Sequence, residues 1–307
     1  MGARDSNAGT GTLYCGVETG GTKIVCLVGS GPDDIRAETS FPTSSPDEVL
    51  AKTIGFLQES QRTFGEIAAI GVASFGPVDL RADSPTFGHI KRTPKAGWSS
   101  VDVAGSIQRA VNKPVAFDTD VNGAGIGEYE WGAGQGLFNF VYVTIGTGIG
   151  GGIILDGQPL RGVSHPELGH IRPFHDRERD PFPGACPFHG DCLEGLASGS
   201  AIFARWEKTL EELGPEHEAL ELEAGYLAHL CTELTYIVSP QKIILGGGVT
   251  GAPGLLPAVR RQTRTALSEY LSDPLYTNTL DDYIVLPDLG NRAGVMGALA
   301  MARRLAP

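Results

Sequence analysis

Cysteine and histidine residues with the spacing of a metal site stand close together in the second half of the chain. In CPFHGDCLEG, Cys186, His189 and Cys192 follow one another with two residues between neighbours, so one tight loop can aim two thiolates and an imidazole at a single point. Tetrahedral zinc requires a fourth ligand, and a histidine of a neighbouring segment would close the site. In order of preference, the candidates are His170, His165 and His175. With four protein ligands, such a zinc would be structural rather than catalytic.

A disulfide between Cys186 and Cys192 is the weaker interpretation of the same loop. The chain has five cysteines, an odd number, and its first residues, MGARDSNAGTGT, contain no apolar stretch of the kind found in signal peptides. We therefore expect reduced thiols and a cytoplasmic protein.

Polar side chains also follow a short apolar stretch in VAFDTDVNGAG, at 115–125. Because strand ends carry the chemistry of many α/β proteins, Asp120 or Asp118 is a candidate for the general base that takes the proton of an attacking hydroxyl group. Asn122 would project on the same side as Asp120 if the backbone stayed extended, and its amide could then hold a substrate hydroxyl. Further acceptors for hydroxyl groups are Glu167, His170 and Glu194. Several such groups suit a polyol better than an apolar or anionic substrate.

Glycine and threonine gather at the tips of two expected β-hairpins, at 13–29 and 140–157. Backbone amides that converge at such a tip can bind an anion, and threonine hydroxyls add donors without adding charge. The first tip contains Gly20, Gly21, Thr22 and Lys23, and the second contains Thr147, Gly148 and Gly150. A third glycine turn is GGGV, at 246–249. Lys23 could contact a phosphate or only face solvent.

The stretch GTGIGG, at 146–151, matches the glycine pattern of dinucleotide-binding proteins, but its context excludes that interpretation. A dinucleotide site requires a helix to begin within the glycines, whereas GIIL continues here as a strand. A P-loop is excluded as well, because the sequence contains neither GKS nor GKT. Phosphate binding at hairpin tips is the interpretation that is left.

The two hairpins are also two copies of one pattern. They align at a constant offset, which places Tyr142 on Tyr14. A weaker similarity links 66–79 with 241–254, where in each case a buried strand runs into a glycine turn. A duplicated lobe explains both similarities and predicts a boundary near residue 118.

Helices are expected between the strands. Ser45 and Pro46 form the preferred start of one helix, and apolar residues recur at helical spacing through 221–238. Further helices are expected at 102–111, 194–206, 254–271 and 292–305. Strands that alternate with helices predict an α/β fold with covered sheets. Residues 1–12, which are small and polar, are expected to form a disordered tail.

The composition sets limits on the class of protein. The chain has 307 residues, of which 41% are hydrophobic and 20% charged, and this is enough apolar material for packed cores. No run of about 18 uncharged apolar residues is present, so no membrane span is expected. The formal charge of −12 repels phosphate backbones, which argues against nucleic acid as a partner.

Taken in order, the GGTK hairpin, DTDVN, GTGIGGG, HPELGH and the Cys/His loop resemble the ROK family of sugar kinases over roughly residues 13–303. The resemblance implies an α/β, duplicated, actin-like (ribonuclease H-like) fold with two lobes. The first lobe would comprise 13–118, completed by the helix at 292–305, and the second would comprise 119–291, with a zinc-binding loop at 165–195. The histidine between the cysteines is similar to the fructokinase branch, whereas the glucokinase branch has the spacing CxCGxxGC, which this chain lacks.

The resemblance also implies roles for individual residues, with Asp120 as the general base. The residues that would bind the sugar are Asn122, Glu167, His170, Glu194, Gly76 and Gly97. Those that would bind ATP are Gly20, Gly21, Thr22, Lys23, Thr147, Gly148, Gly247 and Gly248. Those that would bind zinc are His170, Cys186, His189 and Cys192. His170 could serve both metal and sugar through different ring nitrogens.

The implied reaction is transfer of the γ-phosphoryl group of ATP to the 6-hydroxyl of D-fructose, with magnesium held mostly by phosphates and water. Mannose, glucose or an N-acetylhexosamine is the alternative substrate, because such sugars differ in single hydroxyl positions. A remote alternative is a sugar-sensing regulator, which would require a helix-turn-helix before the first strand, where only residues 1–12 stand. A homodimer is implied. For the charged loop at 172–185, a solvated insertion is favoured over a lid or a dimer contact.

Overall fold

The computed structural model describes residues 11–277 and 280–306. The chain divides into two compact units, one comprising Met1–Gly123 with Gly294–Pro307 and the other Ala124–Ala293. Most of the expected disordered tail, residues 1–10, lies outside the described residues, and Gly11 and Thr12 at its end are exposed.

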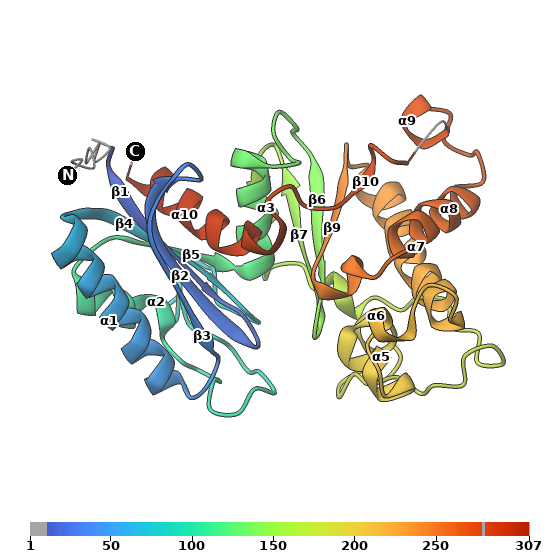
Figure 1. Cartoon of the computed structure of the whole chain (residues 1–307), viewed down its shortest axis with the longest axis horizontal. Coiled ribbons are helices and arrows are strands. Elements are labelled where there is room, and N and C mark those ends of the chain that lie inside the picture. The colour runs from blue at the N-terminus through green and yellow to red at the C-terminus, as the bar shows by residue number, and fades with distance from the viewer. Residues whose placement is uncertain (1–10, 278–279, 307) are drawn as a thin grey trace, which may run out of the picture. The chain divides into compact units, whose positions relative to one another are not determined.

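The first unit contains a five-stranded sheet with the order β3-β2-β1-β4-β5 (Figure 1). Its strands are β1 (Leu13–Thr19), β2 (Lys23–Gly31), β3 (Asp34–Pro42), β4 (Ile67–Ser74) and β5 (Val115–Thr119). The hairpin β1–β2 is antiparallel, as predicted, whereas β1, β4 and β5 run parallel. Their last residues, Thr19, Ser74 and Thr119, are in register. The chain therefore leaves three neighbouring strands at one edge of the sheet.

Helices cover both faces of this sheet. They are α1 (Pro46–Phe64), α2 (Val103–Val111) and α10 (Ala293–Leu305). Figure 1 shows α1 and α2 on one side of the sheet and α10 on the other. Cys15 and Val17 of β1 belong to the core under α1 and α2, which includes Leu57 and Ile107. Because side chains alternate along a strand, the residue between them, Gly16, faces α10.

Helix α10 lies directly on the sheet because two strands carry glycine where it crosses them. Gly16 and Gly71 are paired in register on β1 and β4. A Cβ atom on Gly16 would lie 2.6 Å from the carbonyl oxygen of Val295, and one on Gly71 would lie 1.8 Å from that of Ala298. Since neither distance is tolerable, any larger residue would displace the helix. Glycine on two paired strands thus allows the C-terminal helix α10 to pack closely on the sheet that contains the first strand of the chain.

The second unit contains a sheet with the order β10-β9-β6-β7-β8. Its strands are β6 (Phe140–Ile145), β7 (Ile149–Leu155), β8 (Gln158–Pro159), β9 (Ile243–Gly246) and β10 (Ile284–Val285). Its strands β6, β7, β8, β9 and β10 occupy the positions of β1, β2, β3, β4 and β5 in the first sheet. The directions also correspond, because β6–β7 and β7–β8 are antiparallel, while β6–β9 and β9–β10 are parallel. The predicted duplication is confirmed.

The second unit also contains most of the helices of the described chain. They are α4 (Leu193–Ala197), α5 (Gly199–Trp206), α6 (Leu210–Leu213), α7 (Glu218–Val238), α8 (Leu255–Leu267) and α9 (Pro274–Thr277), with single turns at η1 (Leu168–His170), η2 (Gly248–Gly251) and η3 (Gly290–Arg292). Val141, Val143 and Ile145 of β6 pack into the core with α7 and α8, whereas Phe140 and Tyr142 face the other way. No helix within the described ranges is long and apolar enough to cross a membrane.

Helix α3 (Asp120–Trp131) follows β5 without a loop, begins in the first unit and ends in the second. The expectation that the backbone stays extended from Asp120 to Asn122 is therefore wrong. In a helix, residues two apart project in different directions, so the two side chains do not share a side in the way a strand would place them. The expected helix at 194–206 is also interrupted, because Ser198 ends α4 and caps α5 by accepting a bond from the amide of Ala201.

Candidate functional site

The predicted site residues fall into two groups, one in each unit. The group in the first unit comprises Gly20, Gly21, Thr22, Lys23, Gly76, Gly97, Asp120 and Asn122. The group in the second unit comprises Thr147, Gly148, Glu167, His170, Cys186, His189, Cys192, Glu194, Gly247 and Gly248. Each group has its own geometry.

The tip of the hairpin β1–β2 is braced by backbone contacts and leaves its last two residues exposed. Gly20 donates its amide to the carbonyl of Lys23 at 2.9 Å and accepts from the hydroxyl of Thr43 at 2.8 Å. The amide of Thr43 in turn donates to the carbonyl of Thr22 at 2.9 Å. Thr22 and Lys23 are both exposed. A hydroxyl and an ammonium group are thus presented at a tip whose backbone is held in place.

A carboxylate that the sequence reasoning missed lies next to this tip. Glu18 precedes Thr19 at the end of β1, and its Oε2 atom is buried with no hydrogen-bond partner among residues 11–277 and 280–306. Burial raises the pKa of this carboxyl, whereas Lys23 and the amide of Val295 lower it. The available signal was an acidic residue inside an otherwise apolar strand just before GGTK.

The two aspartates at the end of β5 differ in what surrounds them. Asp118 is fully buried and accepts bonds from the amide of Thr119 at 2.8 Å and from the side-chain amide of Asn122 at 2.6 Å. Asp120, the first residue of α3, is partly exposed and accepts from the amide of Val121 at 2.9 Å. The carboxylate of Asp118 is therefore buried in local structure, whereas that of Asp120 is partly open to solvent.

The side chain of Asn122 is fixed by one hydrogen bond, and its oxygen makes none within the described ranges. Its side chain is 1% exposed, and its amide nitrogen is bound to Asp118. The oxygen Oδ1 is buried and has no hydrogen-bond partner within the described ranges. An unused acceptor is costly in a protein interior, so a hydroxyl donor that reached this oxygen would stabilise it.

Gly76 and Gly97 lie beside aromatic side chains in the same unit. Gly76 directly follows Phe75 at the end of β4, and Gly97 directly precedes Trp98. The two rings meet edge to face, with centroids 5.1 Å apart. The two predicted glycines therefore flank one aromatic pair.

In the second unit, the tip of the hairpin β6–β7 carries a carboxylate. The amide of Gly146 donates to the carbonyl of Gly148 at 2.9 Å, and Gly199 at the start of α5 donates to the carbonyl of Gly146 at 2.7 Å. Glu194 of α4 accepts from the amide of Ile149 at 3.0 Å. The predicted residues Gly148 and Glu194 are thus neighbours.

The glycines after β9 lie against the same hairpin. β9 pairs parallel with β6, so Gly246 is in register with Thr144. Gly247 has φ of +92°, and a Cβ atom there would lie 2.3 Å from the carbonyl oxygen of Ile145. Only glycine fits this close approach, which brings Gly247 and Gly248 next to the residues before Thr147. The predicted nucleotide residues of the second unit are therefore brought together.

Glu167 stands beside the metal-type cluster. Its side chain is 46% exposed, and His165 Nδ1 lies 3.4 Å from its Oε1. Partial burial raises the pKa of this carboxyl, His165 and His170 lower it, and Glu194 raises it again. Glu194 is thus the least of the groups that affect the charge of Glu167.

His170, Cys186, His189 and Cys192 form a cluster that could hold a metal ion. One ligand atom from each lies within 4.8 Å of all the others. Nδ1 of His170 is 3.5 Å from Sγ of Cys192 and 3.9 Å from Sγ of Cys186, which is 3.6 Å from Nδ1 of His189. Tetrahedral zinc with ordinary bond lengths would place such atoms about 3.4 to 3.8 Å apart. The three closest pairs are near this spacing, and the widest, at up to 4.8 Å, would have to close by about 1 Å for the four side chains to hold zinc.

The other interpretations of this loop are wrong. All five cysteines are free, so Cys186 and Cys192 form no disulfide. His175 donates from Nε2 to the carbonyl of Asp180 at 2.9 Å, and neither it nor His165 is in the cluster. Burial raises the pKa of the Cys192 thiol to about 11. A buried thiol keeps its proton at neutral pH unless a bound metal cation displaces that proton.

The charged loop at 172–185 is largely exposed, as the favoured interpretation expects, and several of its side chains make specific contacts. Arg172 and Arg177 pair with Asp191 at 2.6 Å and 2.5 Å. Asp180 is 3% exposed and accepts bonds from Tyr226 at 2.6 Å and Arg205 at 2.9 Å. Because Asp191 stands between His189 and Cys192, these contacts fix the cysteine loop from outside.

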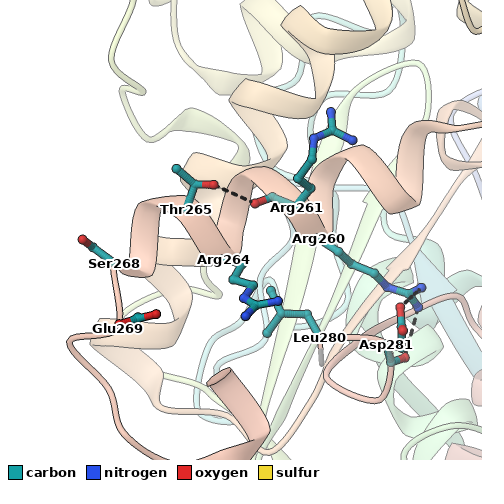
Figure 2. A pocket seen from close by; sticks show the side chains of 8 residues that line it. All are labelled: Arg260, Arg261, Arg264, Thr265, Ser268, Glu269, Leu280 and Asp281. Carbon is teal, nitrogen blue, oxygen red and sulfur yellow. Dashed lines mark hydrogen bonds and ion pairs between the residues drawn. The ribbon is translucent and has the colours of Figure 1, made fainter. Parts of the chain in front are cut away.

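A separate cavity of about 610 Å³ lies along the C-terminal part of α8 (Figure 2). Three arginines line it, but Arg260 is paired with Asp281 at 2.7 Å and Arg261 with Glu221 at 2.5 Å. Figure 2 shows the arginine side chains pointing in different directions. None of the predicted site residues lines this cavity, so it is separate from the candidate site.

Comparison with known proteins covers nearly the whole chain. Residues 14–305 match the model of the ROK family. The chain is 43% identical to a fructokinase of Zymomonas mobilis over 294 residues, which cover 94% of this chain and 96% of the relative. It resembles a ROK hexokinase structure from Thermus thermophilus with a TM-score of 0.77 and 27% identity, over 96% and 99% of the two chains. A ROK glucokinase from Streptomyces griseus, solved with glucose and AMPPNP, gives a TM-score of 0.73 and 25% identity over 95% and 99%.

Proposed function

This chain belongs to the ROK family, and we propose that it phosphorylates the 6-hydroxyl of D-fructose with ATP. Its two sheets with one shared strand order form the actin-like fold of ROK sugar kinases. Fructose is the preferred sugar because the similar protein of Zymomonas mobilis is named a fructokinase and matches over nearly its entire length. The histidine between Cys186 and Cys192 supports the zinc-containing fructokinase branch.

The observation that carries the proposal is the environment of Asp120. It is partly exposed at the start of α3, at the sheet edge where β1 also ends in the tip that holds Thr22 and Lys23. We assign Asp120 as the general base, because Asp118 is buried and already accepts two bonds. In the reaction, the carboxylate of Asp120 takes the proton as the sugar oxygen bonds to the γ-phosphorus and ADP leaves with the electrons of the broken bond.

Sugar and nucleotide are assigned to different predicted residues. The unused oxygen of Asn122 and the carboxylates of Glu167 and Glu194 supply acceptors for sugar hydroxyls. His170 reaches the thiol cluster through Nδ1, so Nε2 is the atom that would serve the sugar. Gly76 and Gly97 would border the ring. We assign the phosphates to Gly20, Gly21, Thr22, Lys23, Thr147 and Gly148, and the adenosine to Gly247 and Gly248.

The metals have separate tasks. Magnesium, when bound with ATP, would neutralise charge on the phosphates and would be held mostly by them and by water. Zinc, when bound by His170, Cys186, His189 and Cys192, would hold the loop at 165–195 in place. Ion pairs also hold this loop in place without metal, namely those of Arg172 and Arg177 with Asp191.

We further propose that the two units are the lobes of the kinase and that the protein is a cytoplasmic homodimer. The lobe boundary then lies within α3, at Gly123, and α10 completes the first lobe. These assignments rest on family membership. Size-exclusion chromatography with light scattering would test the dimer.

The test of the proposed function is a comparison of sugars. ADP formation by the purified protein with MgATP would be measured with fructose, mannose, glucose and N-acetylmannosamine, each over a range of concentrations. We expect kcat/KM to be highest for fructose and ³¹P NMR to identify fructose 6-phosphate as product. A higher kcat/KM for another sugar would move the substrate to that sugar, and no turnover with any sugar would contradict the kinase.

A further inference from the structure

Lys95 directs its ammonium group at the tip of the hairpin β1–β2. Its Nζ donates a hydrogen bond to the carbonyl of Gly21. The same atom lies 5.7 Å from the centroid of the Phe75 ring, a distance at which the face of an aromatic ring attracts a cation. Within the described ranges, Lys95 forms no ion pair, so its charge is not neutralised by a carboxylate.

The register of the sheet places this charge near Asp120. Phe75 follows Ser74 of β4 and donates its amide to the carbonyl of Thr19 at 2.8 Å. Ser74 is in register with Thr119, the residue before Asp120. Neighbouring strands lie about 5 Å apart. Lys95, the hairpin tip and the proposed general base therefore gather at one edge of one sheet, within one unit.

The turn that carries Lys95 is fixed by Trp98. The indole of Trp98 is 1% exposed, packs edge to face on Phe75 with centroids 5.1 Å apart, and donates from Nε1 to the carbonyl of Ser44 at 3.0 Å. The backbone amide of Trp98 also donates to the carbonyl of Lys95 at 3.2 Å. A charge that is held in place before reaction needs little reorganisation when a substrate arrives.

Bracing of the tip does not require a charged residue. Thr43 already performs this task with its hydroxyl on Gly20 and its amide on Thr22. An ammonium group has three N–H donors. With one of them on the carbonyl of Gly21 and the ring of Phe75 nearby, Lys95 can still donate to a further partner. A phosphate oxygen is the partner that suits a partly buried, unpaired cation at a tip of backbone amides.

We propose that Lys95 is a further catalytic residue, whose ammonium group contacts the phosphoryl group during its transfer. This inference rests on the proposed function. As the sugar oxygen bonds to phosphorus and the bond to ADP breaks, the proton passes to Asp120, and Lys95 stays protonated throughout. Its role is to stabilise negative charge on the non-bridging oxygens, which counts most in the transition state.

Three variants test this role against simple bracing. Lys95→Met keeps the length of the side chain over Phe75 and removes the charge, Lys95→Arg keeps the charge, and Thr43→Val removes a neutral brace of the same tip. Steady-state kinetics would be measured with MgATP and the best of the four sugars. We expect Lys95→Met to lower kcat about 100-fold with little change in KM for ATP, Lys95→Arg to restore about a tenth of wild-type kcat or more, and Thr43→Val to stay within about threefold.

Several results would overturn the inference. They are a kcat for Lys95→Met within about threefold of wild type, an equal loss in Thr43→Val, or a failure of arginine to restore activity. Should Lys95→Met melt early, Lys95→Gln takes its place as the neutral variant. Failure of the proposed function is separate, because the wild-type protein would then phosphorylate none of the sugars.

Discussion

The two units have one sheet topology and differ in the charge at their hairpin tips. In the first unit, Lys23 stands at the tip of β1–β2 and Lys95 donates to Gly21. In the second, the carboxylate of Glu194 binds the amide next to the tip of β6–β7. A duplicated backbone thus supplies two similar turns, and the residues that arrive from other segments decide which ligand each turn suits.

The same contrast holds for the elements around the sheets. The outer strand β3 has nine residues, whereas its counterpart β8 has two, and the second unit instead carries a long excursion between β8 and α4 that includes the metal-type cluster. We infer that the first unit contributes the general base and the two lysines at its hairpin tip, and the second the metal-type cluster with the carboxylates Glu167 and Glu194. Four experiments would sharpen or break this division.

The largest effect is expected for Asp120→Asn in the first unit. Loss of the general base should lower kcat roughly 1,000-fold, while the melting temperature and the metal content stay at wild-type values, because the cluster lies in the other unit. Asp118→Asn is the control, and it should lower stability more than turnover, since Asp118 is buried. A kcat for Asp120→Asn within about tenfold of wild type would remove this residue from the role of base.

Cys192→Ser should remove metal from the second unit. Serine is a poor ligand for zinc, so elemental analysis should find no zinc in the variant. Without bound metal the free energy of unfolding should fall by about 3 kcal/mol, which lowers the melting temperature by about 6 to 12 °C. Cys231→Ser is a matched control, because Cys231 is also a buried free cysteine of this unit but stands outside the cluster. Equal metal content in both variants would disprove the ligand assignment.

A smaller loss of stability is expected for Gly71→Ala in the first unit. The new Cβ atom would lie 1.8 Å from the carbonyl oxygen of Ala298, so α10 must shift, at a cost of about 2 kcal/mol. Gly55→Ala in α1 is the control, because no atom lies within 4 Å of its added Cβ, and alanine favours helix there by about 0.5 to 1 kcal/mol. Chemical denaturation would compare them, and equal stability of Gly71→Ala and wild type would contradict the close packing.

The last experiment concerns the pH dependence of stability, through a buried acid of the second unit. Glu223 of α7 is 2% exposed, and neither carboxyl oxygen has a hydrogen-bond partner within the described ranges. Burial raises its pKa well above the usual value, although Arg205 lowers it. The folded protein therefore keeps a proton that the unfolded chain releases near pH 4.5, and the free energy of unfolding falls as pH rises above that value, by up to about 1.4 kcal/mol per pH unit.

Glu223→Gln should abolish this dependence. Glutamine has a similar shape and no charge to bury. The free energy of unfolding of the variant, measured by urea denaturation, should therefore rise relative to that of the wild type between pH 5 and pH 8. A difference in stability that stays constant over this range would show that Glu223 is ionised in the folded protein.

Local pattern was enough to predict the elements that carry chemistry. The hairpins at 13–29 and 140–157, the start of α1 at Pro46 and the loop with Cys186, His189 and Cys192 all depend on neighbours in the sequence, and each is present. Such features follow from backbone geometry and side-chain spacing, which act over a few residues.

Other features depend on residues that are far apart. The extended path expected from Asp120 to Asn122 was wrong, because α3 begins directly after β5. The charged loop at 172–185 is largely exposed, but the contacts of its Asp180 with Arg205 and Tyr226 have no trace in its own composition. Side chains of this kind find their partners only when the chain has folded.

By itself, the sequence determined that two similar hairpins and one cluster of thiols and imidazoles would form. Tertiary structure alone decided that Lys95 meets Gly21, that α10 rests on Gly16 and Gly71, and that Asp118 rather than Asp120 is buried. The physical reason is that spacing along the chain sets local direction, whereas burial and charge pairing depend on which distant segments pack together.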